Sequence, residues 1–193
     1  MGKNEDLNNQ HLLNEQRQSC QTREQAEKQQ TRTNRLVEVG QVHGKGRIEE
    51  RNLGERDHSI IQRFLTVLFA LNRTQWGVEV FPELRTQTRI TRFRVPGVLV
   101  TRVEDKFERY VTSPPLIAIE ILLPEDTLSA MRAKAEEYRQ FGIENIWIID
   151  PEPRIAWRYT GDALEQVTTG ELLVSDIAIR VGLSEMFAEL DPK

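Results

Sequence analysis

The feature that most constrains the fold is a near-continuous apolar run over Leu116–Leu123, followed by a helical pattern and then a second apolar run over Asn145–Asp150. Strands buried on both faces read as unbroken apolar runs, and they are typical of parallel sheets covered by helices. Two such strands joined through a helix form a right-handed crossover. The pattern therefore predicts a parallel strand–helix–strand unit within an α/β fold.

The rest of the chain supplies further helices and strands around this unit. Helical periodicity and capping residues predict helices over residues 57–72, 126–141 and 183–190. Gly142 stands where the second of these helices is expected to end. β-Branched and aromatic residues predict strands over residues 76–84, 92–102, 154–160 and 163–167, and one or two short strands over residues 172–181.

Residues 1–34 differ in composition from the remainder of the chain. They are rich in Gln, Asn, Glu and Arg and carry few large aliphatic side chains. Such a segment buries too little apolar surface to offset the entropy of ordering. We therefore expect a disordered polar tail over residues 1–34 and one domain over residues 35–193, with short strands at 36–39 and 47–50. A basic arm that binds nucleic acid is the functional alternative for the tail, although its charge is mixed.

Bulk composition narrows the class of protein. The formal net charge of −4 gives no sign of a strongly basic nucleic-acid binder, although arginines cluster between Arg85 and Arg102. The single cysteine, Cys20, cannot form a disulfide within the chain, which fits a reducing cytosol. No apolar run approaches the roughly 20 residues of a membrane span, and no signal peptide is visible. We expect a cytoplasmic protein with no membrane partner.

Glu120 is the first candidate site residue. It lies inside the apolar run, on the same face of the predicted strand as Ala118 and Leu122. A carboxylate in a strand that is buried on both sides is costly unless a cation or hydrogen bonds compensate it. Glu120 is therefore a candidate functional acid. The alternative is that it lies near enough to the end of the strand, before Pro124, to reach water.

Lys134 is the second candidate site residue. It falls within the apolar arc of the following helix, together with Met131, Ala135 and Tyr138. We expect its ammonium to meet Glu120 in a common cleft, since one crossover separates them; the alternative is a lysine that reaches solvent along its aliphatic stem. An acid and an amine so placed suit phosphodiester hydrolysis. There, carboxylate-bound Mg²⁺ polarises the phosphate and activates water, and a lysine stabilises the developing charge.

Five stretches of the chain resemble the Uma-two family of restriction-endonuclease-like proteins, within the PD-(D/E)XK nuclease superfamily. They are residues 50–59 (ERNLGERDHS), 92–97 (RFRVPG), 114–126 (PPLIAIEILLPED), Lys134 with Tyr138, and 141–151 (FGIENIWIIDP). The resemblance implies a restriction-endonuclease-like α/β core with a central mixed β-sheet flanked by helices, bacterial origin, DNA as a partner, and Mg²⁺ or Mn²⁺ as cofactor. It implies that Glu120 is a catalytic acid and metal ligand and that Lys134 is the catalytic lysine. A homodimer is a further expectation, because many nucleases of this fold act as dimers.

Position 97 departs from the family's pattern. The family has a Pro-Asp pair here, whereas this chain has Pro96-Gly97, and a glycine supplies no metal ligand. We therefore expect a Mg²⁺-dependent DNA endonuclease whose cleavage is reduced or abolished. The acidic residues that could substitute are Glu55, Glu79, Glu83, Glu104 and Asp105. Glu55 is favoured among them, because related nucleases often place an extra acid before the first long helix.

A non-catalytic module that keeps the nuclease fold is the alternative function. It would bind nucleic acid or protein. Its phosphate contacts would come from Arg85, Arg89, Arg92, Arg94 and Arg102, with an affinity that falls steeply as salt rises. A decayed gene product without retained activity is a third hypothesis.

Overall fold

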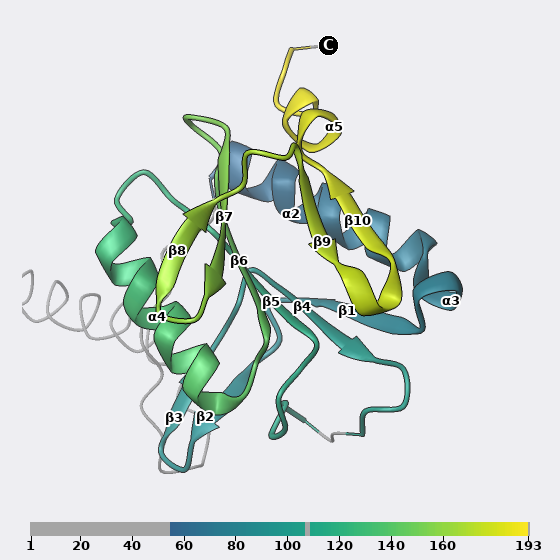
Figure 1. Ribbon diagram of the computed structural model, residues 1–193, viewed down its shortest axis with the longest axis vertical. Helices are drawn as coiled ribbons and strands as arrows, with labels where there is room; N and C mark the ends of the chain where they lie inside the picture. Colours follow the sequence, from purple (N-terminus) through teal and green to yellow (C-terminus); the bar gives the residue numbers. More distant parts are fainter. Residues whose placement is uncertain (1–54, 107–108, 193) are drawn as a thin grey trace, which may run out of the picture. The chain divides into compact units, whose positions relative to one another are not determined.

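A six-stranded mixed sheet forms the centre of the domain (Figure 1). The computed structural model describes residues 55–106 and 109–192, all of which belong to one compact unit. The strand order is β1-β4-β5-β6-β7-β8; β5 and β6 are parallel and the other neighbours antiparallel. The predicted α/β fold with a mixed sheet is confirmed. The strands are β1 (Val78–Pro82), β4 (Val98–Arg102), β5 (Ile117–Ile121), β6 (Asn145–Asp150), β7 (Ile155–Thr160) and β8 (Ala163–Gln166).

Helices and hairpins cover both faces of this sheet. One face carries α2 (Arg56–Leu71), α5 (Leu183–Ala188) and the β9–β10 hairpin (Glu171–Val174 and Ile179–Gly182), which share one apolar core with the sheet. The other face carries α4 (Leu128–Phe141), with a second core of its own. The β2–β3 hairpin (Thr86–Arg89 and Arg92–Arg94) lies beside α4 (Figure 1). A short helix, α3 (Arg73–Trp76), and a 3₁₀ turn at 175–177 complete the described elements.

Alternation along β5 divides its side chains between the two cores. Ile117, Ile119 and Ile121 enter the core under α2, and Ala118 enters the core under α4. All five residues of β5 are buried, as the unbroken apolar run predicts. Since side chains alternate along a strand, Glu120 points to the same face as Ala118, toward α4.

The ends of α4 follow from its sequence. The Thr127 hydroxyl accepts a hydrogen bond of 3.3 Å from the Ala130 N–H and caps the first turn. Gly142 ends the helix with a φ of 104°, in the left-handed region that favours glycine. Because α4 connects β5 to β6, which pair in parallel, the predicted strand–helix–strand unit is confirmed.

Three strand predictions differ from the structure. The strand predicted over residues 92–102 is interrupted between β3 and β4, because Pro96 has no N–H to donate to a ladder. The strand predicted over 76–84 begins only at Val78, since Trp76 belongs to α3. Strand β2 was not predicted, because its sequence Thr-Gln-Thr-Arg contains no apolar residue. The strands predicted at 36–39 and 47–50, and the tail boundary at residue 34, lie outside the described residues.

None of the helices within residues 55–106 and 109–192 is long and apolar enough to cross a membrane.

Candidate active site

Glu120 is a buried carboxylate of the central sheet. Only 6% of the residue is exposed, so the alternative in which it reaches water does not apply. The Tyr138 hydroxyl donates a hydrogen bond of 2.6 Å to its Oε1 atom. Lys134 Nζ lies 3.5 Å from its Oε2 atom. These two groups of α4 compensate a charge that burial would otherwise disfavour.

Lys134 meets Glu120 as the sequence predicts. It lies four residues before Tyr138 on α4, so both side chains project from one face of the helix toward β5. The Lys134 side chain is 31% exposed. Its ammonium therefore touches a buried acid and is also reachable from solvent by an anion. The predicted contact is confirmed, and its catalytic role stays a prediction.

Tyr138 fixes the orientation of the Glu120 carboxylate. Burial raises the pKa of Tyr138 well above its ordinary value of 10.0, and the charge and hydrogen bond of Glu120 raise it further. The phenol therefore stays protonated at neutral pH and acts as a donor. One oxygen of Glu120 is thereby held by Tyr138, while the other faces Lys134.

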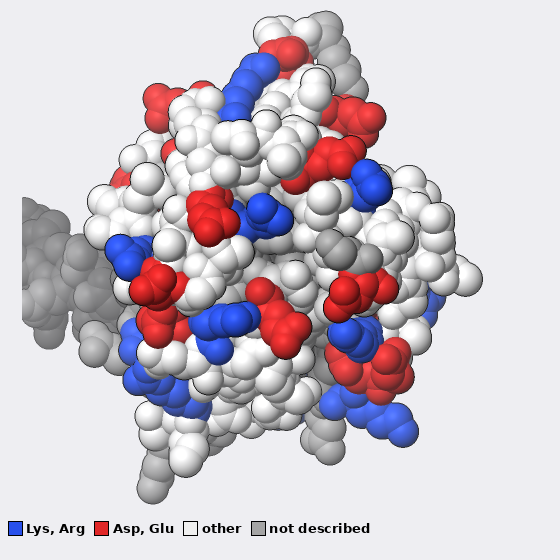
Figure 2. Space-filling view, in the orientation of Figure 1, with Lys and Arg blue, Asp and Glu red and all other residues white. Residues whose placement is uncertain are grey.

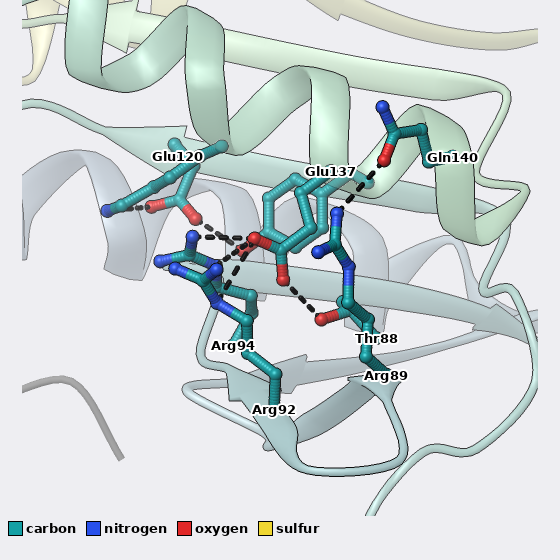
Figure 3. A network of polar contacts seen from close by, with 9 residues as sticks. Thr88, Arg89, Arg92, Arg94, Glu120, Glu137 and Gln140 are labelled. Carbon is teal, nitrogen blue, oxygen red and sulfur yellow. Dashed lines mark hydrogen bonds and ion pairs between the residues drawn. The ribbon is translucent and has the colours of Figure 1, made fainter. Parts of the chain in front are cut away.

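A second buried carboxylate, Glu137, adjoins Tyr138 and was not predicted. Arg94 donates to its Oε2 atom from Nε at 3.0 Å and from Nη2 at 2.6 Å (Figure 3). Arg92 Nε lies 3.3 Å from the same oxygen, and the Thr88 hydroxyl donates to Oε1. Burial alone would raise the pKa of Glu137, but these hydrogen bonds and charges lower it below its ordinary value of 4.5. Glu137 is thus an ionised anchor between α4 and the β2–β3 hairpin.

Gly97 lies beside Glu120 in the sheet. Val98 pairs with Ile119, so the next position along the antiparallel ladder sets Gly97 opposite Glu120. A Cβ atom at position 97 would lie 3.3 Å from the Ile119 carbonyl oxygen and 3.5 Å from the Ile121 side chain. The φ of Gly97 is outside the left-handed region, and a Cβ atom there would require the Ile119 carbonyl to give by a few tenths of an ångström. The Ile121 side chain that this Cβ would contact lies in the core under α2, on the opposite face of β5 from Glu120.

Glu83 is the substitute candidate that the structure brings next to Gly97. Its N–H donates to the Gly97 carbonyl at 3.2 Å. The Gln62 side-chain amide donates to the same carbonyl at 2.8 Å and to Glu83 Oε1 at 3.3 Å. Glu55, in contrast, lies before α2 and lines a pocket of about 450 Å³ whose described lining includes neither Gly97 nor Glu120.

The other three substitute candidates have contacts elsewhere. Glu79 pairs with Arg73, and the Asp105 carboxylate accepts the Arg102 backbone N–H at 2.8 Å. Glu104 is exposed, 4.0 Å from Arg102. Among the residues that the structure describes, no group of three or more His, Cys, Asp or Glu side chains is placed to hold a metal ion.

Most arginines of the predicted cluster contact other side chains of the domain. Arg92 and Arg94 contact Glu137, and Arg89 Nη2 donates to Gln140 at 3.0 Å. The guanidinium of Arg85 lies 5.9 Å from the centre of the Phe93 ring. These arginines build and fix the hairpin beside the candidate site.

The family model described as putative restriction endonuclease (Uma2) matches residues 17–189, so the chain belongs to this family. The predicted resemblance is confirmed.

The fold of this chain is similar to that of solved structures. One is the crystal structure of a putative nuclease belonging to DUF820 from Anabaena variabilis ATCC 29413, with a TM-score of 0.66 and 18% identity over 80% of this chain and 96% of that chain. A cryoEM structure of a DrdV–DNA complex has a TM-score of 0.40 and 16% identity, over 72% of this chain and 12% of that chain. No curated protein matches the sequence.

Proposed function

We propose that this chain is a DNA endonuclease of the PD-(D/E)XK type whose site, built by Glu120 and Lys134, is impaired by Gly97. The observation that carries the proposal is the contact of 3.5 Å between the Lys134 ammonium and the buried Glu120 carboxylate. An acid and an amine that converge from a strand and the following helix suit phosphodiester hydrolysis. Membership of a family described as putative restriction endonucleases supports the same reaction class.

Lys134, Glu120 and Tyr138 have different roles in this proposed site. Lys134 offers an ammonium that can stabilise negative charge on a phosphate approaching from solvent. Glu120 holds that ammonium in place, and Tyr138 holds the carboxylate. Mg²⁺ or Mn²⁺ is the cofactor that the resemblance implies, with Glu120 as its ligand. Gly97 supplies no side-chain ligand where the family has an aspartate, so we propose weak metal binding and slow cleavage.

A plasmid-nicking assay tests the proposal. The chain is incubated with supercoiled plasmid in Mg²⁺ or Mn²⁺, next to Glu120→Gln, which keeps an acceptor for Tyr138. Glu165→Gln on β8, an exposed glutamate away from the site, is the matched control. We expect slow nicking by the wild type and by the control, and loss of nicking in Glu120→Gln. Nicking that Glu120→Gln leaves undiminished would refute the site.

The rate of nicking tests the impairment separately. Fast cutting that depends on Glu120 would show that another acid completes the site, and Glu83 is then the first residue to substitute, because it adjoins Gly97.

A non-catalytic binding module is the second candidate function. It is favoured by Gly97, which supplies no acid where the family has one, and by residues 84–103, which contain five arginines and no acidic residue. Salt-sensitive DNA binding without any cleavage that depends on Glu120 would support this function over hydrolysis.

A further inference from the structure

We infer that the β2–β3 hairpin is a duplex-DNA-binding element whose tip, Ile90, enters a groove of the duplex next to the candidate active site. The inference rests on the proposed function in one respect: it takes DNA as the substrate.

The tip of the hairpin carries a residue that the fold does not explain. Arg89 pairs with Arg92, which leaves Ile90-Thr91 as a two-residue turn. Turns of this length favour Asn, Asp and Gly, whereas a β-branched apolar side chain contributes nothing to them. Ile90 is nevertheless 91% exposed. The Gln87 side-chain amide donates to the Ile90 carbonyl at 2.8 Å and holds the turn in place.

The charge around the tip selects a polyanion as the partner. Residues 84–103 carry Arg85, Arg89, Arg92, Arg94 and Arg102 and no acidic residue. Arg92 and Arg94 contact the Glu137 carboxylate, whereas the contacts of Arg89 with Gln140 and of Arg85 with Phe93 are to uncharged groups. In Figure 2, blue side chains lie over the region of β2–β3, and blue and red side chains are mixed over α4. An apolar side chain flanked by arginines is the combination with which proteins wedge into the minor groove while they neutralise phosphates.

The hairpin is held firmly at its base. The rings of Phe93 and Tyr110 meet edge to face at 4.9 Å, and Arg85 covers the Phe93 ring. The Gln87 N–H donates to the Val111 carbonyl at 2.8 Å, and the Val111 N–H donates to the Arg85 carbonyl at 2.9 Å. The tip therefore projects from an ordered base, which lowers the entropic cost of binding.

Glu137 couples the hairpin to the candidate active site. Its carboxylate binds Arg92 and Arg94 of β3, and the next residue of α4, Tyr138, binds Glu120 (Figure 3). A register shift near Thr88 marks a bulge in β2, and the Thr88 hydroxyl also donates to Glu137. A duplex seated on the hairpin tip is thereby kept at a fixed offset from Lys134.

Binding measurements test the inference without any divalent metal. Fluorescein-labelled duplex DNA is titrated with protein at low salt and its anisotropy is followed. Ile90→Gln should weaken binding about tenfold, whereas Leu71→Gln, which removes an apolar side chain that is 80% exposed at the end of α2, should change it by less than about twofold. Arg89→Gln should weaken binding and lower the salt slope by about 1, with Arg63→Gln on α2 as its control.

A base analogue reports the wedge itself. A duplex that contains 2-aminopurine should brighten when the wild type unstacks a base step, and it should stay dark with Ile90→Gln. Equal affinity of Ile90→Gln and the wild type, no brightening, equally tight binding to single-stranded DNA, or no duplex binding at low salt would each overturn the inference.

Cleavage separates this inference from the proposed function. If nicking that depends on Glu120 is unaffected by Ile90→Gln and Arg89→Gln, the hairpin inference fails and the hydrolytic function stands. If the duplex binds through Ile90 and no nicking depends on Glu120, the hairpin inference stands and the hydrolytic function fails.

Discussion

Replacing Glu137 by alanine removes the carboxylate that holds the Arg94 guanidinium. The Arg94 side chain is 10% exposed and makes two charge-assisted hydrogen bonds to Glu137, at 2.6 and 3.0 Å. Breaking a buried ion pair by deleting one partner costs about 3–5 kcal/mol. We therefore expect Glu137→Ala to lower the free energy of unfolding by this amount. Arg92→Gln should cost less than about 1 kcal/mol, since that side chain is 35% exposed.

Urea unfolding followed by tryptophan fluorescence measures these costs, provided that the m-value is unchanged. A double-mutant cycle with Arg94→Met isolates the pair, and we expect a coupling free energy of about 1.5–3 kcal/mol. A cost below about 1 kcal/mol for Glu137→Ala, or a coupling near zero, would show that Glu137 does not anchor the hairpin.

Three further predictions concern stability. Folding lowers the pKa of Glu137, so at low pH the unfolded chain binds more protons than the folded chain. The stability that Glu137 contributes is therefore fully present above pH 4.5, the ordinary pKa of a glutamate, and is lost as the pH falls through the lower pKa of the folded state. Urea titrations should show the gap between wild type and Glu137→Gln narrowing below about pH 4.5; a constant gap would contradict this. Gly142→Ala should lower the melting temperature more than Gly161→Ala does. The added Cβ at position 142 would lie 2.9 Å from Pro114 Cγ, whereas nothing lies within 4 Å of a Cβ at position 161. Equal losses in melting temperature would show that the clash with Pro114 has no effect. Leu65→Ala, in the core under α2, should lower the free energy of unfolding by about 2–5 kcal/mol. Val67→Ala, on the same helix but half-exposed, should lower it by less than about 1 kcal/mol. Similar urea midpoints for the two variants would argue against the assigned core.

The unit from β5 to β6 was predictable because its signals are local and agree with each other. An unbroken apolar run predicts a strand buried on both faces, and Thr127 and Gly142 delimit the helix that follows. Glu120 and Lys134 could be placed together for the same reason, since strand alternation and helical periodicity both direct them into the space between β5 and α4.

The anchor at Glu137 and the β2–β3 hairpin could not be predicted in this way. Glu137 lies at the edge of the apolar arc of α4, where a glutamate is usually solvated, and its partners Thr88 and Arg94 are more than 40 positions earlier in the chain. Strand β2 depends on its pairing with β3 and on a bridge from Thr86 to Val111, not on an apolar pattern. The sequence signal that could have indicated this anchor is the position of Glu137, an acidic residue three positions after Lys134 on the packing side of the helix.

The rate at which Gly97→Asp nicks supercoiled plasmid in Mg²⁺ tests the central claim most directly. Gly97→Asn is its matched control, because it has the same size and no charge. We predict that Gly97→Asp cuts at least about tenfold faster than the wild type, which corresponds to roughly 1.4 kcal/mol on the barrier. Gly97→Asn should show no such gain, and adding Glu120→Gln should abolish it. A properly folded Gly97→Asp protein that cuts no faster than the wild type, or a gain that survives Glu120→Gln, would contradict this prediction.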